Sequence, residues 1–260
     1  MQFKLQLTQG KGRCFLPFNY QYELSKAISQ LLEKAEPFKN PLLSRNCRGY
    51  ENNGWGPFTF SQLNFDNFLL HQQDQKIEHT GQFATLEIRF AADNTVKDSI
   101  KKVLFEQRLI LGDIPYQISK MEVMSSVEFN DVMVYRCLTP LSLLAKDRDR
   151  EGGARYLSPA DEGFPKFFKE NLLQRLLRFQ PEFQSLKDLD RYCPEIQFEL
   201  LNEPKKKGIT LKGPTEGPLK IVGYQFDFKF KASPILHELG YYEGFGSQST
   251  LGFGYVEVLA

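Results

Sequence analysis

The pattern of apolar and polar residues predicts a β-α-β-β-α-β order in the first half of the chain. Alternation predicts strands with one buried face, and recurrence at three- and four-residue spacing predicts helices with one apolar stripe. The expected strands cover residues 3–7, 57–70, 83–90 and 116–123, and the expected helices cover 24–35 and 93–104. This order is that of the ferredoxin-like fold, in which two helices cover one face of an antiparallel sheet.

A second, less regular round of the same elements follows. Strands are expected at 132–138, 195–201, 224–231 and 255–258, and helices at 164–176 and 233–239. Tyr224, Phe226, Phe228 and Phe230 fall on one side of their strand because successive side chains point to opposite faces. The pattern therefore predicts an α+β protein of two tandem ferredoxin-like, RRM-like domains, at residues 1–126 and 127–260.

Composition limits the number of domains and the kinds of binding site, but it does not identify the function. A chain of 260 residues is long enough for two domains that each bury a core, and its 23 phenylalanines supply much of that core. The net charge of +1 excludes a protein that is basic all over, but it leaves room for a local basic groove. The four cysteines stand far apart without zinc-site spacing, which favours buried or idle thiols.

The sequence predicts a cytoplasmic protein. It begins directly with an alternating strand rather than with a basic and then apolar leader, and no apolar stretch reaches the length that spans a bilayer. We therefore expect no membrane partner.

The most informative segment is a glycine-rich loop near the C-terminus. Gly244-Phe245-Gly246 and Gly252-Phe253-Gly254 flank five residues, Ser247 to Leu251, and an apolar strand follows. Glycine tolerates positive φ and lets a backbone approach a ligand closely, so such a loop can turn its amides toward a phosphate. A tight turn that needs glycine for its geometry alone is the alternative, which the doubling of the unit makes less favoured.

Several segments, in order along the chain, carry a resemblance to a known family. They are Leu16 to Tyr22, Phe58 to Leu63, Leu138 to Pro140, Tyr156 to Pro159, and the loop from Gly244 to Gly254. Together they resemble the CRISPR-associated RAMP-superfamily endoribonucleases that process repeat RNA, the sixth numbered Cas family. The resemblance implies tandem ferredoxin-like domains that recognise the CRISPR repeat in precursor RNA. It also implies one metal-independent cut per repeat, without a cofactor, which releases guide RNAs.

In such enzymes the 2′-hydroxyl beside the scissile bond attacks its own phosphate. This reaction needs a base for the hydroxyl, an acid for the leaving 5′-oxygen and hydrogen-bond donors for the charged phosphorane. Backbone amides of the glycine-rich loop and the hydroxyls of Ser247, Ser249 and Thr250 are the expected phosphate contacts. Loops of this family usually carry a lysine or arginine between the glycine pairs, and this loop has none, so its charge stabilisation depends on a cation from elsewhere.

The expected general base is also replaced. The family places a histidine shortly before a Gly-Tyr pair, and matching on Gly49-Tyr50 puts Asn46 in its position. An amide has no useful proton equilibrium near neutral pH, so Asn46 cannot act as a base. The sequence leaves Tyr50 as a proton donor or acceptor, and Arg45 and Arg48 as groups that neutralise the phosphorane. His237, in the short helix before the loop, is held in reserve, because a histidine is more often structural than catalytic.

Basic residues in two loops are the expected grip on the RNA backbone. One group, in a predicted hairpin, is Lys205, Lys206 and Lys207; the other is Arg148, Arg150 and Arg155. Each is also explained as a solvated loop. As phosphate contacts they give affinity rather than sequence readout, and they predict binding that weakens with salt.

Two other functions remain open. A non-cleaving relative that only binds repeat RNA needs a basic groove but no substitute for Asn46. A structural subunit of a CRISPR effector complex has a related fold and contacts other protein subunits. A homodimer is a further assembly that the sequence allows.

Overall fold

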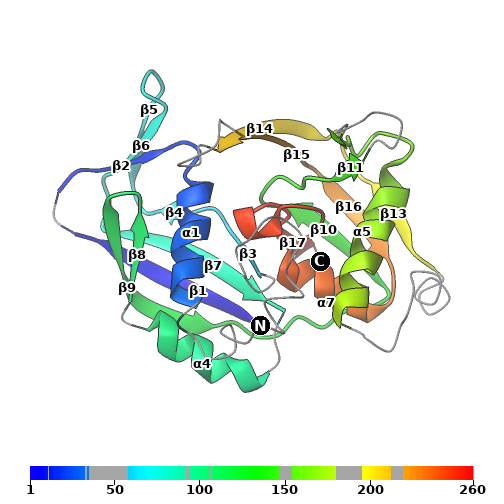
Figure 1. Ribbon diagram of the computed structural model, residues 1–260, viewed down its shortest axis with the longest axis horizontal. Coiled ribbons are helices and arrows are strands. Elements are labelled where there is room, and N and C mark those ends of the chain that lie inside the picture. Colours follow the sequence, from blue (N-terminus) through cyan, green and yellow to red (C-terminus); the bar gives the residue numbers. More distant parts are fainter. Residues whose placement is uncertain are drawn as a thin grey trace. The chain divides into compact units, whose positions relative to one another are not determined.

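The computed structural model describes residues 1–10, 12–32, 34, 58–91, 94–105, 107–146, 154–179, 195–211 and 219–259. The chain forms two compact units (Figure 1). The first comprises Met1–Ser126 together with Leu211–Leu219, and the second comprises Val127–Thr210 and Lys220–Ala260. The main division falls between Ser126 and Val127, whereas Leu211–Leu219 joins the first unit although the sequence assigned it to the second.

The first unit is built on an antiparallel sheet with the strand order β3-β7-β1-β9-β8. Its elements follow the chain as β1 (Gln2–Gln9), α1 (Gln21–Leu32), β3 (Phe58–Phe60), β7 (Phe83–Phe90), α4 (Asn94–Leu104), β8 (Arg108–Leu111) and β9 (Ile114–Val123). Without β8, the order is that of the ferredoxin-like fold, with the first strand between the third and the last. Strand β8 was not expected, and it extends the sheet by pairing with β9.

The core of this unit follows the periodicity of the sequence. Phe3 and Leu5 on β1 are fully buried and pack with the stripe of α1 that carries Leu24, Ile28 and Leu31. Strand β1 is central in the sheet and pairs antiparallel with β7 on one side and with β9 on the other. Helix α1 also contacts α4, so both helices cover the same face of the sheet.

A small second sheet, which the sequence did not predict, belongs to the first unit. It has the order β2-β6-β5, formed by β2 (Cys14–Pro17), β5 (Phe68–His71) and β6 (Lys76–His79). The strand expected over 57–70 is therefore wrong as a single element. It divides into β3, the short β4 (Asn64–Phe65) and β5, because the chain leaves the main sheet after β4 to form the β5–β6 hairpin.

The second unit repeats the topology of the first. Its sheet has the order β13-β16-β10-β17, from β10 (Val132–Cys137), β13 (Gln197–Leu200), β16 (Asp227–Lys231) and β17 (Val256–Leu259). Helices α5 (Phe164–Phe179) and α7 (Pro234–Glu243) pack against each other. Two ribbons are inserted, β11–β12 (Leu144–Lys146 with Ala154–Tyr156) and β14–β15 (Lys205–Leu211 with Leu219–Gln225). The prediction of tandem ferredoxin-like domains is thus confirmed.

Phenylalanines form the core of the second unit. Phe168 of α5 lies 5.1 Å from Phe198, 5.9 Å from Phe228 and 5.7 Å from Phe245, measured between ring centroids. The strand expected over 224–231 is divided at Phe226 into the end of β15 and the whole of β16. The carbonyl oxygen of Phe226 accepts a hydrogen bond from the amide of Cys137 on β10, so the chain passes here from the β14–β15 ribbon to the main sheet of the unit. No helix in the described part of the chain is long and apolar enough to cross a membrane.

Candidate nucleic-acid interface

The glycine-rich loop, residues 244–254, connects α7 to β17 and takes its shape from its four glycines. All four have φ between 69° and 85°, a region that residues with a side chain rarely adopt. A Cβ on Gly246 would collide with the carbonyl oxygen of Ser142, and one on Gly254 with that of Phe245. Backbone geometry and close packing within the protein therefore already require these two glycines, as in the tight-turn alternative.

Several backbone amides of the loop are used inside the second unit. Four of them donate to carbonyl oxygens at 2.6–2.9 Å, namely those of Phe245, Ser247, Gly252 and Gly254. At the tip, Gln248 is left-handed (φ 66°, ψ 26°) and a 3-10 turn, Ser249–Leu251, follows. The amides of Gln248 and Ser249 have no hydrogen-bond partner among the described residues. A change of handedness turns successive amides to one side, so the tip alone has the geometry of an anion-binding nest.

A buried arginine from α5 holds the start of the loop. Arg175 donates from Nη1 to the carbonyl oxygen of Gly244 at 2.7 Å and to that of Gly246 at 3.4 Å. Its Nε and Nη2 donate to Oε2 of Glu243 at 3.0 and 2.7 Å. This is a cation brought to the loop from elsewhere in the chain, but Glu243 neutralises it and the guanidinium faces loop carbonyls. Arg175 therefore shapes the loop and does not offer its charge to a ligand.

Sequence reasoning missed Arg175 because it lies within the apolar stripe of its helix. Leu172 and Leu176 flank it and are buried, and Arg175 itself is 9% exposed. Buried charged residues are almost always paired. An arginine in an apolar helical stripe, together with a glutamate directly before the first glycine, was the available signal.

His237 is a core residue in this structure. Its side chain is fully buried; Nε2 donates to the carbonyl oxygen of Asp131 at 3.3 Å, and Nδ1 accepts from the hydroxyl of Tyr135 at 2.9 Å. Burial lowers the pKa of His237, so the neutral imidazole is favoured. Both ring nitrogens are thus engaged within the protein, and the structure places neither on the surface as the reserve catalytic role requires.

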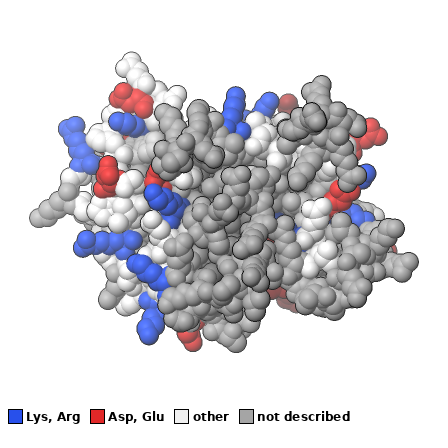
Figure 2. Space-filling view, viewed as in Figure 1, with Lys and Arg blue, Asp and Glu red and all other residues white. Residues whose placement is uncertain are grey.

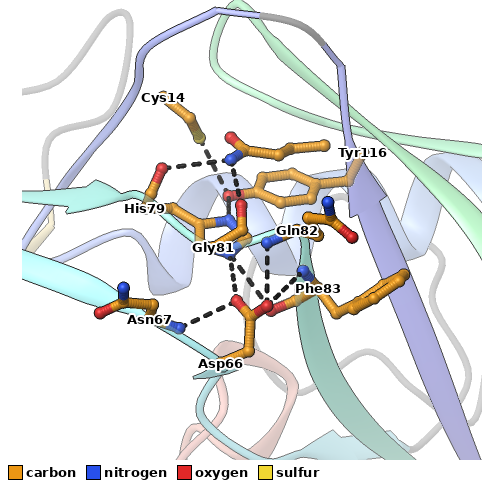
Figure 3. Close-up of polar contacts among 9 residues, drawn as sticks. Cys14, Asp66, Asn67, His79, Gly81, Gln82, Phe83 and Tyr116 are labelled. Carbon is orange, nitrogen blue, oxygen red and sulfur yellow. Dashed lines mark hydrogen bonds and ion pairs between the residues drawn. The ribbon is translucent and has the colours of Figure 1, made fainter.

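The other two histidines lie in the first unit. His71 on β5 is partly exposed and contacts Oε2 of Glu78 at 2.8 Å. His79 on β6 is buried in a chain of polar groups (Figure 3). Its Nε2 donates to Oδ1 of Asp66 at 3.1 Å, and Nδ1 lies 3.1 Å from the hydroxyl of Tyr116. That hydroxyl lies 3.0 Å from Sγ of Cys14.

Asp66 ends this chain of polar groups and closes the turn before β7. Its carboxylate accepts from the amides of Asn67, Gln82 and Phe83 at 2.9, 2.9 and 3.1 Å (Figure 3). Desolvation acts to raise the pKa of Asp66, but the hydrogen bonds from His79 and these amides outweigh it and lower the pKa to about 2. The carboxylate is therefore ionised at neutral pH, and the network ties the β4–β5 and β6–β7 connections together.

Exposed lysines line the β14–β15 ribbon, the hairpin that the sequence predicted. Lys205, Lys206 and Lys207 are exposed on β14, and Lys220 on β15 is adjacent to Gly208. None of the four forms an ion pair with a described carboxylate. Figure 2 shows basic side chains at the upper edge of the molecule, where Figure 1 draws this ribbon, and mixed charges over the other described parts of this face.

The basic residues on the four-stranded sheet of the second unit, in contrast, form ion pairs. Arg136 contacts Asp227 and Glu257, Lys229 contacts Glu199, and Lys231 contacts Glu195. This difference makes the ribbon, rather than the open face of the sheet, the better anion-binding surface. Arg155 on β12 is also exposed and has no ion pair among the described residues.

The remaining candidates lie outside the described residues. They are Arg45, Asn46, Arg48 and Tyr50 near the expected base, and Arg148 and Arg150 of the arginine group. The roles given to them stay predictions.

Two ferredoxin-like units, of which the second carries a glycine-rich loop before its last strand, define a protein of the RAMP class. The model of the family "CRISPR associated protein Cas6, C-terminal" matches residues 122–258, which is more than half of the chain. The chain belongs to the Cas6 family, as the sequence predicted.

Full-length relatives agree with this membership. An endoribonuclease-like Cas6 protein of Pyrococcus furiosus is 22% identical over 100% of this chain and 99% of its own. The CRISPR-associated endoribonuclease Cas6 1 of Methanocaldococcus jannaschii is 24% identical over 98% of this chain and 92% of its own. The solved structure of an RAMP protein binding different RNA substrates superimposes with a TM-score of 0.75 at 20% identity, and each chain is covered completely. At this identity, the structural similarity establishes the shared fold.

Proposed function

We propose that this protein binds CRISPR repeat RNA in the cytoplasm and cuts the precursor once per repeat to release guide RNAs. The observation that carries the proposal is the Cas6 family match over the second unit, including its glycine-rich loop. Relatives that align along nearly the whole chain are named as CRISPR-associated endoribonucleases, or as endoribonuclease-like, and this supports the same activity.

The reaction is attack of the 2′-hydroxyl on the adjacent phosphorus, with loss of the 5′-oxygen. The upstream product then ends in a 2′,3′-cyclic phosphate and the downstream product begins with a 5′-hydroxyl. The attacking oxygen is part of the substrate, so the reaction requires positioning, proton transfer and charge stabilisation but no water nucleophile. We therefore propose that the cut is independent of metal ions.

The tip of the glycine-rich loop is the phosphate contact that we propose. The amides of Gln248 and Ser249 have no hydrogen-bond partner among the described residues, and the hydroxyls of Ser247, Ser249 and Thr250 lie in the same short segment. Because six other amides of the loop donate hydrogen bonds within the protein, the contact is smaller than the whole loop. It supplies hydrogen bonds without a cation.

We assign the proton transfers to and from the RNA to residues close to Asn46 in the sequence. Tyr50 is the first candidate for a proton donor, because an unperturbed tyrosine stays protonated at neutral pH. Arg45 and Arg48 are proposed to stabilise charge on the phosphorane. The burial of His237, with both ring nitrogens engaged, favours a structural role over its reserve role.

Affinity comes from the lysines of the β14–β15 ribbon and from Arg155, with Arg148 and Arg150 as neighbouring contacts. The ribbon lysines are exposed and form no ion pair with a described carboxylate, so RNA phosphates compete with none of the described acidic side chains for them. Contacts of this kind grip the backbone and do not read bases.

Asn46 at the expected base position favours a second candidate, a Cas6 relative that binds repeat RNA without cutting it. Incubation with cognate repeat RNA and with a shuffled RNA of the same composition separates the two. The endoribonuclease predicts a single cut in the repeat, with a cyclic phosphate and a 5′-hydroxyl at the new ends. Selective binding with intact RNA favours the non-cleaving relative, and equal binding of both RNAs contradicts repeat recognition.

A further inference from the structure

Strand β5 exposes three successive large apolar side chains. Phe68, Leu69 and Leu70 are 46, 55 and 52% exposed. The strand lies at the edge of its sheet, and its hairpin projects from the rest of the first unit (Figure 1). Proteins usually protect such an edge with lysine, proline or a bulge, because it pairs readily with another strand. Strand β5 has none of these, so its exposed edge is suited to a partner.

The pairing of β5 with β6 determines which backbone groups face this edge. Phe68 lies opposite His79 and Leu70 opposite Ile77. The amide of Thr80 donates to the carbonyl oxygen of Asn67 at 3.1 Å, one residue beyond the first of these pairs. In an antiparallel ladder, this makes Phe68 and Leu70 non-hydrogen-bonded positions toward β6. Their N–H and C=O groups therefore point away from β6, to the free edge.

We infer that β5 pairs antiparallel with β5 of a second copy of this chain, around a two-fold axis at Leu69. In this register Phe68 lies opposite Leu70 of the second copy, and the outward N–H and C=O groups of both residues form hydrogen bonds. Leu69 lies opposite Leu69, on the other face of the ribbon. One residue further out, Asn67 lies opposite His71, so the register brings no two acidic or two basic side chains together.

The strand is suited to a copy of itself for two reasons. The outward backbone groups at Phe68 and Leu70 are symmetric about Leu69, so the pairing uses all of them and closes as a dimer. Pairing of β5 with a different edge of a second copy would leave the β5 of that copy free, and the assembly would grow into a chain of molecules. The side chains at both ends of the strand are already supported, because Phe68 packs against Phe65 at 6.0 Å and His71 against Phe15 at 5.5 Å between ring centroids.

A symmetric disulfide tests this register directly in the full-length protein. Residues in a non-hydrogen-bonded pair have Cα atoms about 4.5 Å apart, within the range that a disulfide bridges. We expect Leu69→Cys to form a disulfide-linked dimer under mild oxidation, with the bridge mapped to position 69 by peptide mass analysis. Ile110→Cys is the matched control, because Ile110 is 55% exposed on the edge strand β8. The parent, oxidised in parallel, accounts for the native cysteines.

Charge pairing at the same position tests the non-covalent dimer. By sedimentation over a range of concentrations, the parent and Ile110→Lys should dimerise alike. Leu69→Lys and Leu69→Glu should each lose about tenfold or more in association constant, because like charges meet across the axis. An equimolar mixture of the two variants should form the heterodimer. A monomeric parent with no excess cross-linking of Leu69→Cys over Ile110→Cys overturns the inference, as do a dimer that Leu69→Lys leaves intact and growth into longer assemblies.

Discussion

Arg175 and Glu243 form a buried ion pair that ties helix α5 to the end of helix α7, directly before the glycine-rich loop. Nη2 of Arg175 lies 2.7 Å from Oε2 of Glu243, and the same guanidinium donates to the carbonyl oxygens of Gly244 and Gly246. Arg175 therefore holds the start of the loop, and Glu243 neutralises its charge. The phosphate contact that we propose is formed at the tip, by the amides of Gln248 and Ser249.

Removing one member of this pair should be far more damaging than removing both. Arg175→Met leaves the Glu243 carboxylate buried without its partner, and breaking such a pair costs about 3–5 kcal/mol. Adding Glu243→Met should restore much of the free energy of unfolding, which urea denaturation measures. Arg136→Met, in an exposed pair with Asp227, is the control and should have a much smaller effect. A single variant as stable as the double variant contradicts this account.

Alanine at the loop glycines should destabilise the fold by more than positive φ alone explains. Gly246→Ala and Gly254→Ala place a Cβ against backbone carbonyl oxygens, whereas Gly112 has φ 62° and open space around it. Gly112→Ala should cost only the left-handed strain, about 1–2 kcal/mol, and the two loop variants clearly more. Thermal unfolding of the three variants measures the difference. Equal losses would mean that the loop can relax away from Ser142 and Phe245.

Neutralising the ribbon lysines should flatten the salt dependence of RNA binding. Each lost contact to a single-stranded phosphate lowers the slope of log K against log salt by about 0.7. The triple variant of Lys205, Lys206 and Lys207 to glutamine should therefore lose up to about 2 in slope. Lys229→Gln with Lys231→Gln is the matched control, because both lysines are paired with glutamates. A slope unchanged in the triple variant excludes the ribbon from the phosphate contacts.

His237 should act on stability and its pH dependence rather than on catalysis. Burial lowers the pKa of His237 in the folded state, so the unfolded chain takes up the proton first as pH falls. The stability that the neutral imidazole contributes is complete above about pH 6.5 and is lost progressively below it. The stability of His237→Asn should fall less steeply than that of the parent between pH 7 and 5. Its single-turnover cleavage rate, measured on folded protein, should be unchanged; a large rate loss with unaltered stability would restore the catalytic role.

Residue periodicity predicted the two sheets and the covering helices because it records which face of each element is buried. The strand at 83–90 agrees with β7 in both of its bounds, since its apolar residues alternate against the core. The break at Phe226 was missed because Phe226 continues the alternation of apolar and polar residues, although β15 ends directly before it and β16 begins directly after it. The β5–β6 hairpin was missed because its exposed apolar residues resemble those of a core strand.

The candidate site was harder to predict because its structure depends on contacts between distant residues. Arg175 and Glu243 are 68 residues apart, and His79 contacts Asp66, 13 residues away, and Tyr116, 37 residues away. Local patterns cannot reveal such partners. The resemblance, in contrast, identified the family correctly, because its segments are ordered along the whole chain.

The most direct test of the central claim is single-turnover cleavage of cognate repeat RNA in EDTA. The account predicts one cut by the parent, with a 5′-hydroxyl on the downstream product. The rate should be slowed about 10²-fold or more by Tyr50→Phe, because a general acid or base typically contributes this much. It should be raised by Asn46→His, which restores an imidazole at the expected base position. Tight, repeat-specific binding by a parent that leaves the RNA uncut would contradict the claim that this protein is an endoribonuclease.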